Sequence, residues 1–226
     1  MNHDDEKKYF ELFALKILKE YQNVDIDKLI HDEKPDWQDI NNSIGIEITR
    51  NSTGTLFWSE LEKVKKPIPD KNIEKFNNRF RKNGGSGIPI EQARIIFNDK
   101  EVKDSFGFND KYLYIIPSYN DDFSEVNRSL NKKLKKLNEI YKEMQDNRLF
   151  IFSPIYTTEK MIDNELQNII KIQSEKKRKF NIVYVCLLHE LIVFNIKENS
   201  YKCIKMDKEV FDRLSEEANK EVISKK

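Results

Sequence analysis

The second half of the chain alternates long amphipathic stretches with short apolar runs, and this alternation restricts the possible folds most. Residues 124–144 have the 3.6-residue spacing of a helix, and residues 149–152 read as a buried strand. A second helix is predicted at about 158–172, then strands at 181–188, 191–196 and 201–205, and a last helix at 207–222. Strands interleaved with helices favour an α/β or α+β fold with a mixed central sheet flanked by helices.

The first half adds a helix, a hairpin and a segment with no clear period. Apolar residues recur at helical spacing over residues 5–22. Residues 34–40 and 44–49 alternate and are joined by Asn41, Asn42 and Ser43, which predicts a β-hairpin. Residues from about 50 to 118 contain Pro67, Pro69 and a glycine-rich loop. We therefore expect one domain over residues 1–226 with an insertion at about 50–118.

Charge and cysteine content set the limits on partners and compartment. With 40 Lys and Arg against 39 Asp and Glu, the net charge of +1 creates no global field that would attract a polyanion. The apolar runs are too short to span a bilayer. Only Cys186 and Cys203 are present, which favours a reducing compartment. We expect a cytoplasmic protein without a membrane-spanning segment.

The predicted hairpin brings two acidic residues together. If Asn41 and Asn42 are the central turn residues, continuing the register outward places Asp36 directly opposite Glu47. Alternation then assigns one face to Trp37, Ile44, Ile46 and Ile48, and the other to Asp36, Gln38, Gly45, Glu47 and Thr49. The sheet is expected to bury the first face and to present two carboxylates on the second.

Opposed carboxylates need a compensating charge or full hydration. Their Cβ atoms would lie about 5 Å apart, and like charges so placed destabilise a strand pair. Mg²⁺ would remove the repulsion, because it takes oxygen ligands from one or two carboxylates and fills its other positions with water and phosphate. The alternative is that Asp36 and Glu47 are solvated strand residues without a ligand.

Pro35-Asp36, a short turn and an apolar strand with Glu47 at its middle resemble the PD-(D/E)XK nuclease superfamily. The resemblance implies a restriction-endonuclease-like core with an insertion, and a Mg²⁺ or Mn²⁺ ion held by Asp36 and Glu47. That family carries Lys two positions after the second acid, where this chain has Thr49. A neutral hydroxyl does not supply the positive charge of that lysine.

Some members of the superfamily take the lysine from the next core helix. In residues 124–144, at about 100° per residue, Lys133 falls between Val126 and Ile140 on the apolar face. Lys133 is therefore predicted to supply the missing charge, although its stem could instead lie along the helix edge. Glu6, near the inward face of the first helix, is a weaker candidate for a further acid, by resemblance to related nucleases.

The expected function is metal-dependent hydrolysis of phosphodiester bonds in nucleic acid, with Asp36, Glu47 and Lys133 as catalytic residues. DNA is the commoner substrate in the superfamily that the hairpin resembles. Thr49 keeps a second hypothesis open, namely a nuclease fold without catalysis that serves as a nucleic-acid-binding or protein-interaction module.

Overall fold

The computed structural model describes residues 3–50, 74, 123–153, 159–187 and 190–224. All of them except Glu74 belong to one unit of the chain. Apart from Arg50 and Glu74, the insertion expected at about 50–118 lies outside the described residues. The cap expected at Thr158 also lies outside them.

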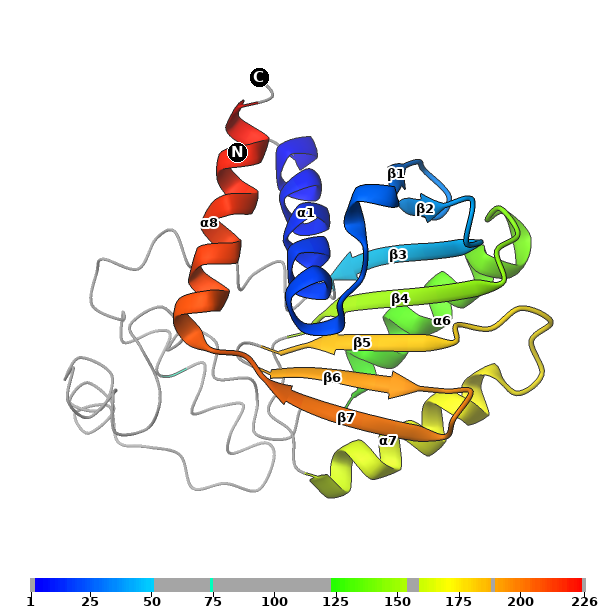
Figure 1. The fold of residues 1–226 in the computed structure, drawn as a ribbon. Helices are drawn as coiled ribbons and strands as arrows, with labels where there is room; N and C mark the ends of the chain where they lie inside the picture. Colours follow the sequence, from blue (N-terminus) through cyan, green and yellow to red (C-terminus); the bar gives the residue numbers. More distant parts are fainter. Residues whose placement is uncertain (1–2, 51–73, 75–122, 154–158, 188–189, 225–226) are drawn as a thin grey trace. The chain divides into compact units, whose positions relative to one another are not determined.

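The described residues form one seven-stranded mixed sheet whose strands follow one another in chain order (Figure 1). Its strands are β1 (Ile30–His31), β2 (Trp37–Asp39), β3 (Ile44–Arg50), β4 (Asp146–Phe152), β5 (Ile182–Cys186), β6 (Glu190–Asn195) and β7 (Ser200–Lys205). The pairs β3–β4 and β4–β5 are parallel, and all other pairs are antiparallel. The expected mixed sheet flanked by helices is therefore confirmed.

The described helices are α1 (His3–Gln22), the short 3₁₀ helix η1 (Ile26–Lys28), α6 (Ser124–Glu139), α7 (Glu159–Gln173) and α8 (Lys208–Ser224). Helices α6 and α7 each precede the next parallel strand of the sheet. Right-handed crossovers in one direction place such helices on the same face. Figure 1 shows both behind the sheet and α1 in front of it.

Alternation along β4 separates two apolar layers. Phe152 contacts Phe10 and Phe13 of α1, with ring centroids 5.2 and 5.7 Å apart. Phe13 also meets Phe211 of α8 at 5.0 Å, which joins the terminal helices to this layer. The alternate β4 residues, Leu149 and Ile151, are fully buried and belong to the opposite face.

Helix α6 fixes the second layer through one apolar stripe. Its buried residues are Val126, Leu130, Leu134 and Leu137, at the spacing that the sequence predicted. The helix ends at Glu139 rather than at the expected Met144, and Arg178 binds the carbonyls of Tyr141 and Lys142 just beyond it. Arg178, in the basic segment 176–179, thus binds backbone carbonyls just after the C-terminal end of α6.

The hairpin has the predicted register but a shorter first strand. Trp37 pairs with Ile46, Gln38 with Gly45 and Asp39 with Ile44, and the turn closes through the Ser43 N–H and the Ile40 carbonyl at 3.3 Å. The strand expected from residue 34 begins only at Trp37. Pro35 has no N–H, so it does not continue the ladder.

Pro35 packs directly over Gly45 of β3. A Cβ built on Gly45 would lie 2.7 Å from Cγ of Pro35 and 3.0 Å from Cγ of Met144. Only a residue without a side chain allows this approach. Gly45 therefore helps to set where Pro35, and Asp36 after it, lie against β3.

None of the helices in the described part of the chain is long and apolar enough to cross a membrane.

We predict that Gly45→Ala destabilises the protein by about 1 to 3 kcal/mol, because the added methyl overpacks a filled site. Urea unfolding followed by tryptophan fluorescence measures the change. Pro35→Ala removes the atom that the new methyl would meet, so the double variant should recover part of the loss relative to the sum of the single variants. Wild-type stability of Gly45→Ala would show that the contact with Pro35 relaxes at little cost.

Candidate active site

Asp36 and Glu47 lie together at the start of β2, which Asp36 immediately precedes, beside the middle of β3. Asp36 precedes Trp37, whose partner is Ile46, so the same register carries Asp36 to the position beside Glu47. The two residues are 5% and 3% exposed. The hypothesis of two solvated carboxylates is therefore wrong, since both side chains are withdrawn from water. The expectation that the sheet buries only the other face of the hairpin is also wrong, because Asp36, Gln38 and Glu47 are all buried.

The carboxylate of Asp36, rather than a backbone carbonyl, accepts a hydrogen bond from a backbone N–H of β3. Its Oδ2 accepts a hydrogen bond of 2.9 Å from the N–H of Ile48, two residues beyond Ile46, where the β2–β3 ladder ends. Burial, followed by the negative charge of Glu47, raises the pKa of Asp36 to about 7 against an ordinary 3.8. The hydrogen bond from Ile48 acts in the opposite direction but is outweighed.

Glu47 has one carboxylate oxygen in use and one without a donor. Its Oε1 forms an ion pair and hydrogen bond with Nζ of Lys133. Its Oε2 is buried and accepts no hydrogen bond from the residues that the structure describes. Burial, the charge of Glu47 and a side-chain hydrogen bond with Glu47 also raise the pKa of Tyr141, so the Tyr141 hydroxyl lies beside the same carboxylate. A buried anionic oxygen without a donor is costly unless a ligand compensates it.

Lys133 lies where the helical spacing placed it. Its side chain is 13% exposed and runs from α6 to the sheet, beside the buried stripe of the helix. The preceding residue, Lys132, is exposed. The contact with Glu47 rules out a stem that merely follows the helix edge, and it brings a positive charge to the acidic pair.

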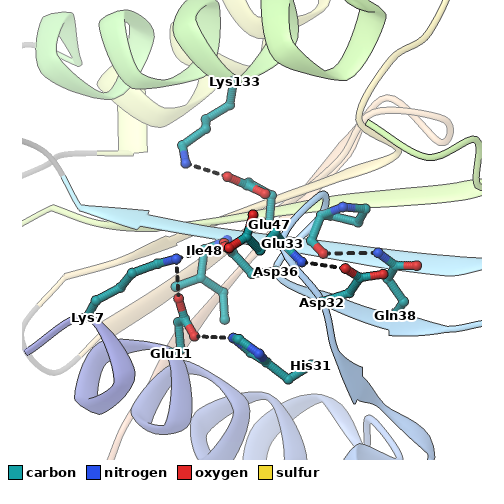
Figure 2. Close-up of polar contacts among 11 residues, drawn as sticks. Lys7, Glu11, His31, Asp32, Glu33, Asp36, Gln38, Glu47, Ile48 and Lys133 are labelled. Carbon is teal, nitrogen blue, oxygen red and sulfur yellow. Dashed lines mark hydrogen bonds and ion pairs between the residues drawn. The ribbon is translucent and has the colours of Figure 1, made fainter. Parts of the chain in front are cut away.

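Helix α1 approaches the acidic pair from the other side (Figure 2). Nζ of Lys7 lies 3.8 Å from Oδ1 of Asp36 and 3.4 Å from Oε1 of Glu11. Glu11 is 3% exposed, and its Oε2 contacts Nε2 of His31 at 3.1 Å. The negative charge of Glu11 also acts to raise the pKa of Asp36.

Glu11 is thus the acid of α1 whose charge reaches the pair, and the sequence reasoning missed it. The candidate named there, Glu6, forms an ion pair with Arg50 at the end of β3. A signal for Glu11 was present, because it shares a helical face with Ala14 and Leu18, three and seven residues further on. An acid in an apolar stripe is the pattern expected of a buried carboxylate.

Comparisons with protein-family models, curated proteins and solved structures found no match.

The donor set suits a hard divalent cation in type but is small in number. Asp36 and Glu47 offer carboxylate oxygens, which Mg²⁺ and Mn²⁺ prefer. Among the described residues no group of three or more His, Cys, Asp or Glu side chains is arranged to hold a metal. The residues that fit such an ion are these two acids, with the unpartnered Oε2 of Glu47 as the clearest open position.

The pKa of Asp36 predicts how stability depends on pH without divalent cations. Because the folded pKa of about 7 exceeds the unfolded value, the folded state binds the extra proton between about pH 4 and pH 7. The free energy of unfolding should therefore fall as pH rises through this range. Asp36→Asn should flatten this dependence and be at least as stable as wild type at pH 8, measured by urea unfolding in EDTA. An equal pH slope in both proteins would contradict a raised pKa.

Proposed function

We propose that this protein hydrolyses phosphodiester bonds in nucleic acid, with DNA as the substrate, in a divalent-metal-dependent reaction. The observation that carries the proposal is the cluster of Asp36, Glu47 and Lys133, in which the partly buried ammonium of Lys133 pairs with Glu47 beside a second buried carboxylate. The resemblance of the hairpin to PD-(D/E)XK nucleases, and with it a restriction-endonuclease-like core, points in the same direction.

Asp36 and Glu47 would hold the metal ion. The Oε2 of Glu47, which Lys133 does not pair, and a deprotonated Asp36 would supply the anionic oxygens. A bound Mg²⁺ or Mn²⁺ supplies Lewis acidity toward the scissile phosphate and lowers the pKa of water. Asp36, whose pKa of about 7 lies near working pH, must lose its proton before it acts as a ligand.

Lys133 would stabilise the negative charge that develops on the phosphate. The ion pair with Glu47 and the packing of α6 hold its ammonium in one place, at 13% exposure. A positioned cation in a site with little water stabilises a transition state more than it would in bulk water. This role is the one that the resembling family gives to a lysine on the strand, where Thr49 stands here.

A second candidate function is a nuclease fold that binds nucleic acid or protein without catalysis. Lys133 already neutralises Oε1 of Glu47, and Lys7 lies beside Asp36. Two lysines in these places reduce the carboxylate repulsion without any metal ion. Metal binding separates the two candidates, because only the first requires it.

Mg²⁺ or Mn²⁺ at millimolar concentration should raise the Tm of the wild type, since a ligand bound only by the folded state stabilises it. The Tm shift should grow between pH 6 and pH 8. Below the pKa of Asp36, each pH unit should raise the affinity for the metal ion by up to about tenfold, because the ion displaces one proton. Glu47→Gln should abolish the shift, whereas Glu139→Gln, at an exposed carboxylate of α6, should keep it. A wild-type Tm unmoved by either ion would overturn the metal-dependent function.

Lys133→Met should lower DNA cleavage by about 10² or more while the Tm response to metal remains, because only the charge near the phosphate is lost. The methionine keeps most of the apolar stem, so folding should persist. The matched control is Lys132→Met on the exposed side of α6, which should weaken substrate binding modestly and in a salt-dependent way. Cleavage at the wild-type rate by Lys133→Met would refute the assignment.

A further inference from the structure

The acidic pair is approached by two lysines that differ in exposure. Lys133 reaches Glu47 from α6 and is 13% exposed, whereas Lys7 reaches Asp36 from α1 and is 58% exposed. Figure 2 shows them on opposite sides of the two carboxylates. A cation that serves only to neutralise buried charge needs no exposure to solvent. The exposure of Lys7 leaves part of its side chain open to a ligand.

Lys7 also has an anchor that is independent of Asp36. Its ammonium lies 3.4 Å from Oε1 of Glu11, one turn further along α1. Glu11 is itself held by His31 at 3.1 Å, and the ring of His31 packs edge-on against Trp37 at 5.0 Å. Partial burial acts to lower the pKa of Lys7, but Glu11 and then Asp36 outweigh it and raise the pKa. Lys7 therefore stays charged.

A divalent cation at the pair would change the charges around Lys7. Its ion pair with Asp36, at 3.8 Å, is the longer of its two contacts. Once a metal ion neutralises Asp36, the attraction across that gap falls, while the contact with Glu11 remains. An ammonium has three donors and no acceptor, and it binds phosphate oxygens as a compact charge.

We propose that Lys7 binds a backbone phosphate of the nucleic acid beside the scissile bond. The inference rests on the proposed function for the class of ligand, and it adds a substrate contact on the α1 side of the site. Glu11 keeps the ammonium beside the acidic pair whether or not Asp36 is charged. Lys7 is thus a substrate-binding residue, distinct from Lys133, which is committed to Glu47.

The test uses Asp36→Asn as the parent protein, in EDTA, so that neither metal binding nor cleavage is needed. This substitution also removes the charge that competes with phosphate for Lys7. Binding of random-sequence single-stranded and duplex DNA is measured by fluorescence anisotropy over a series of KCl concentrations. Adding Lys7→Met should weaken binding several-fold and lower the slope of log K against log salt by about 0.7 to 0.9, the value for one phosphate contact.

Lys19 supplies the matched control. It lies on the same helix, is 56% exposed and pairs with Asp27 at 3.5 Å, so Lys19→Met removes an equivalent charge away from the site. It should leave affinity and slope unchanged, and Lys7→Arg should retain most of both. A slope unaltered by Lys7→Met, or no DNA binding by the parent, overturns the proposal.

The outcome is separable from that of the proposed function. If wild type shows no metal-dependent Tm shift and no cleavage but DNA binding still depends on Lys7, the hydrolytic function fails and the phosphate contact stands. If wild type cleaves DNA and Lys7→Met keeps the full salt slope, the phosphate contact fails alone.

Discussion

Two carboxylates buried side by side on one hairpin are the constraint around which the described fold is organised. Asp36 and Glu47 are each about 95% or more buried, and like charges so close disfavour the ionised state of both. The structure lowers this cost in three ways. The pKa of Asp36 is raised, so its carboxyl group holds a proton more readily. Asp36 also accepts a hydrogen bond from the N–H of Ile48, and Glu47 forms an ion pair with Lys133. Lys133 comes from α6 and Lys7 from α1, on opposite faces of the sheet. The hairpin alone would therefore not balance its own negative charge.

The apolar layers place these counter-charges. The stripe of α6 against the sheet fixes the rotation of the helix, and that rotation directs Lys133 toward Glu47. On the other face, contacts of Phe10 and Phe13 with Phe152 set the position of α1, which carries Lys7 and Glu11. The hydrophobic effect that drives this packing is non-directional. The packing nevertheless fixes where the charges of Lys133, Lys7 and Glu11 lie in the site. Gly45 completes the arrangement by letting Pro35 approach β3 closely.

The helices, the strands and the hairpin could be predicted from the sequence wherever apolar residues recur at a regular spacing. The helices α1 and α6, the strands β3 to β7 and the hairpin register all follow from period and turn residues. Strand β1 has two residues and η1 three, too few for any period. The contact of His31 with Glu11 joins residues 20 apart, and no local pattern encodes it. The direction of Lys133 was predictable from its helical angle, but its partner depended on which face of the sheet α6 covers.

The free-energy cost of burying these charges indicates that the cluster does not serve stability alone. The partly buried ion pair Lys133–Glu47 gains little net stability, because desolvation cancels much of the attraction. An unpartnered oxygen on the same carboxylate adds a further penalty. Stability alone would favour apolar residues at these positions, whose neighbours Ile46 and Ile48 are already buried and apolar. Two acids and a lysine at this point of the sheet are what a site that trades stability for binding or catalysis requires.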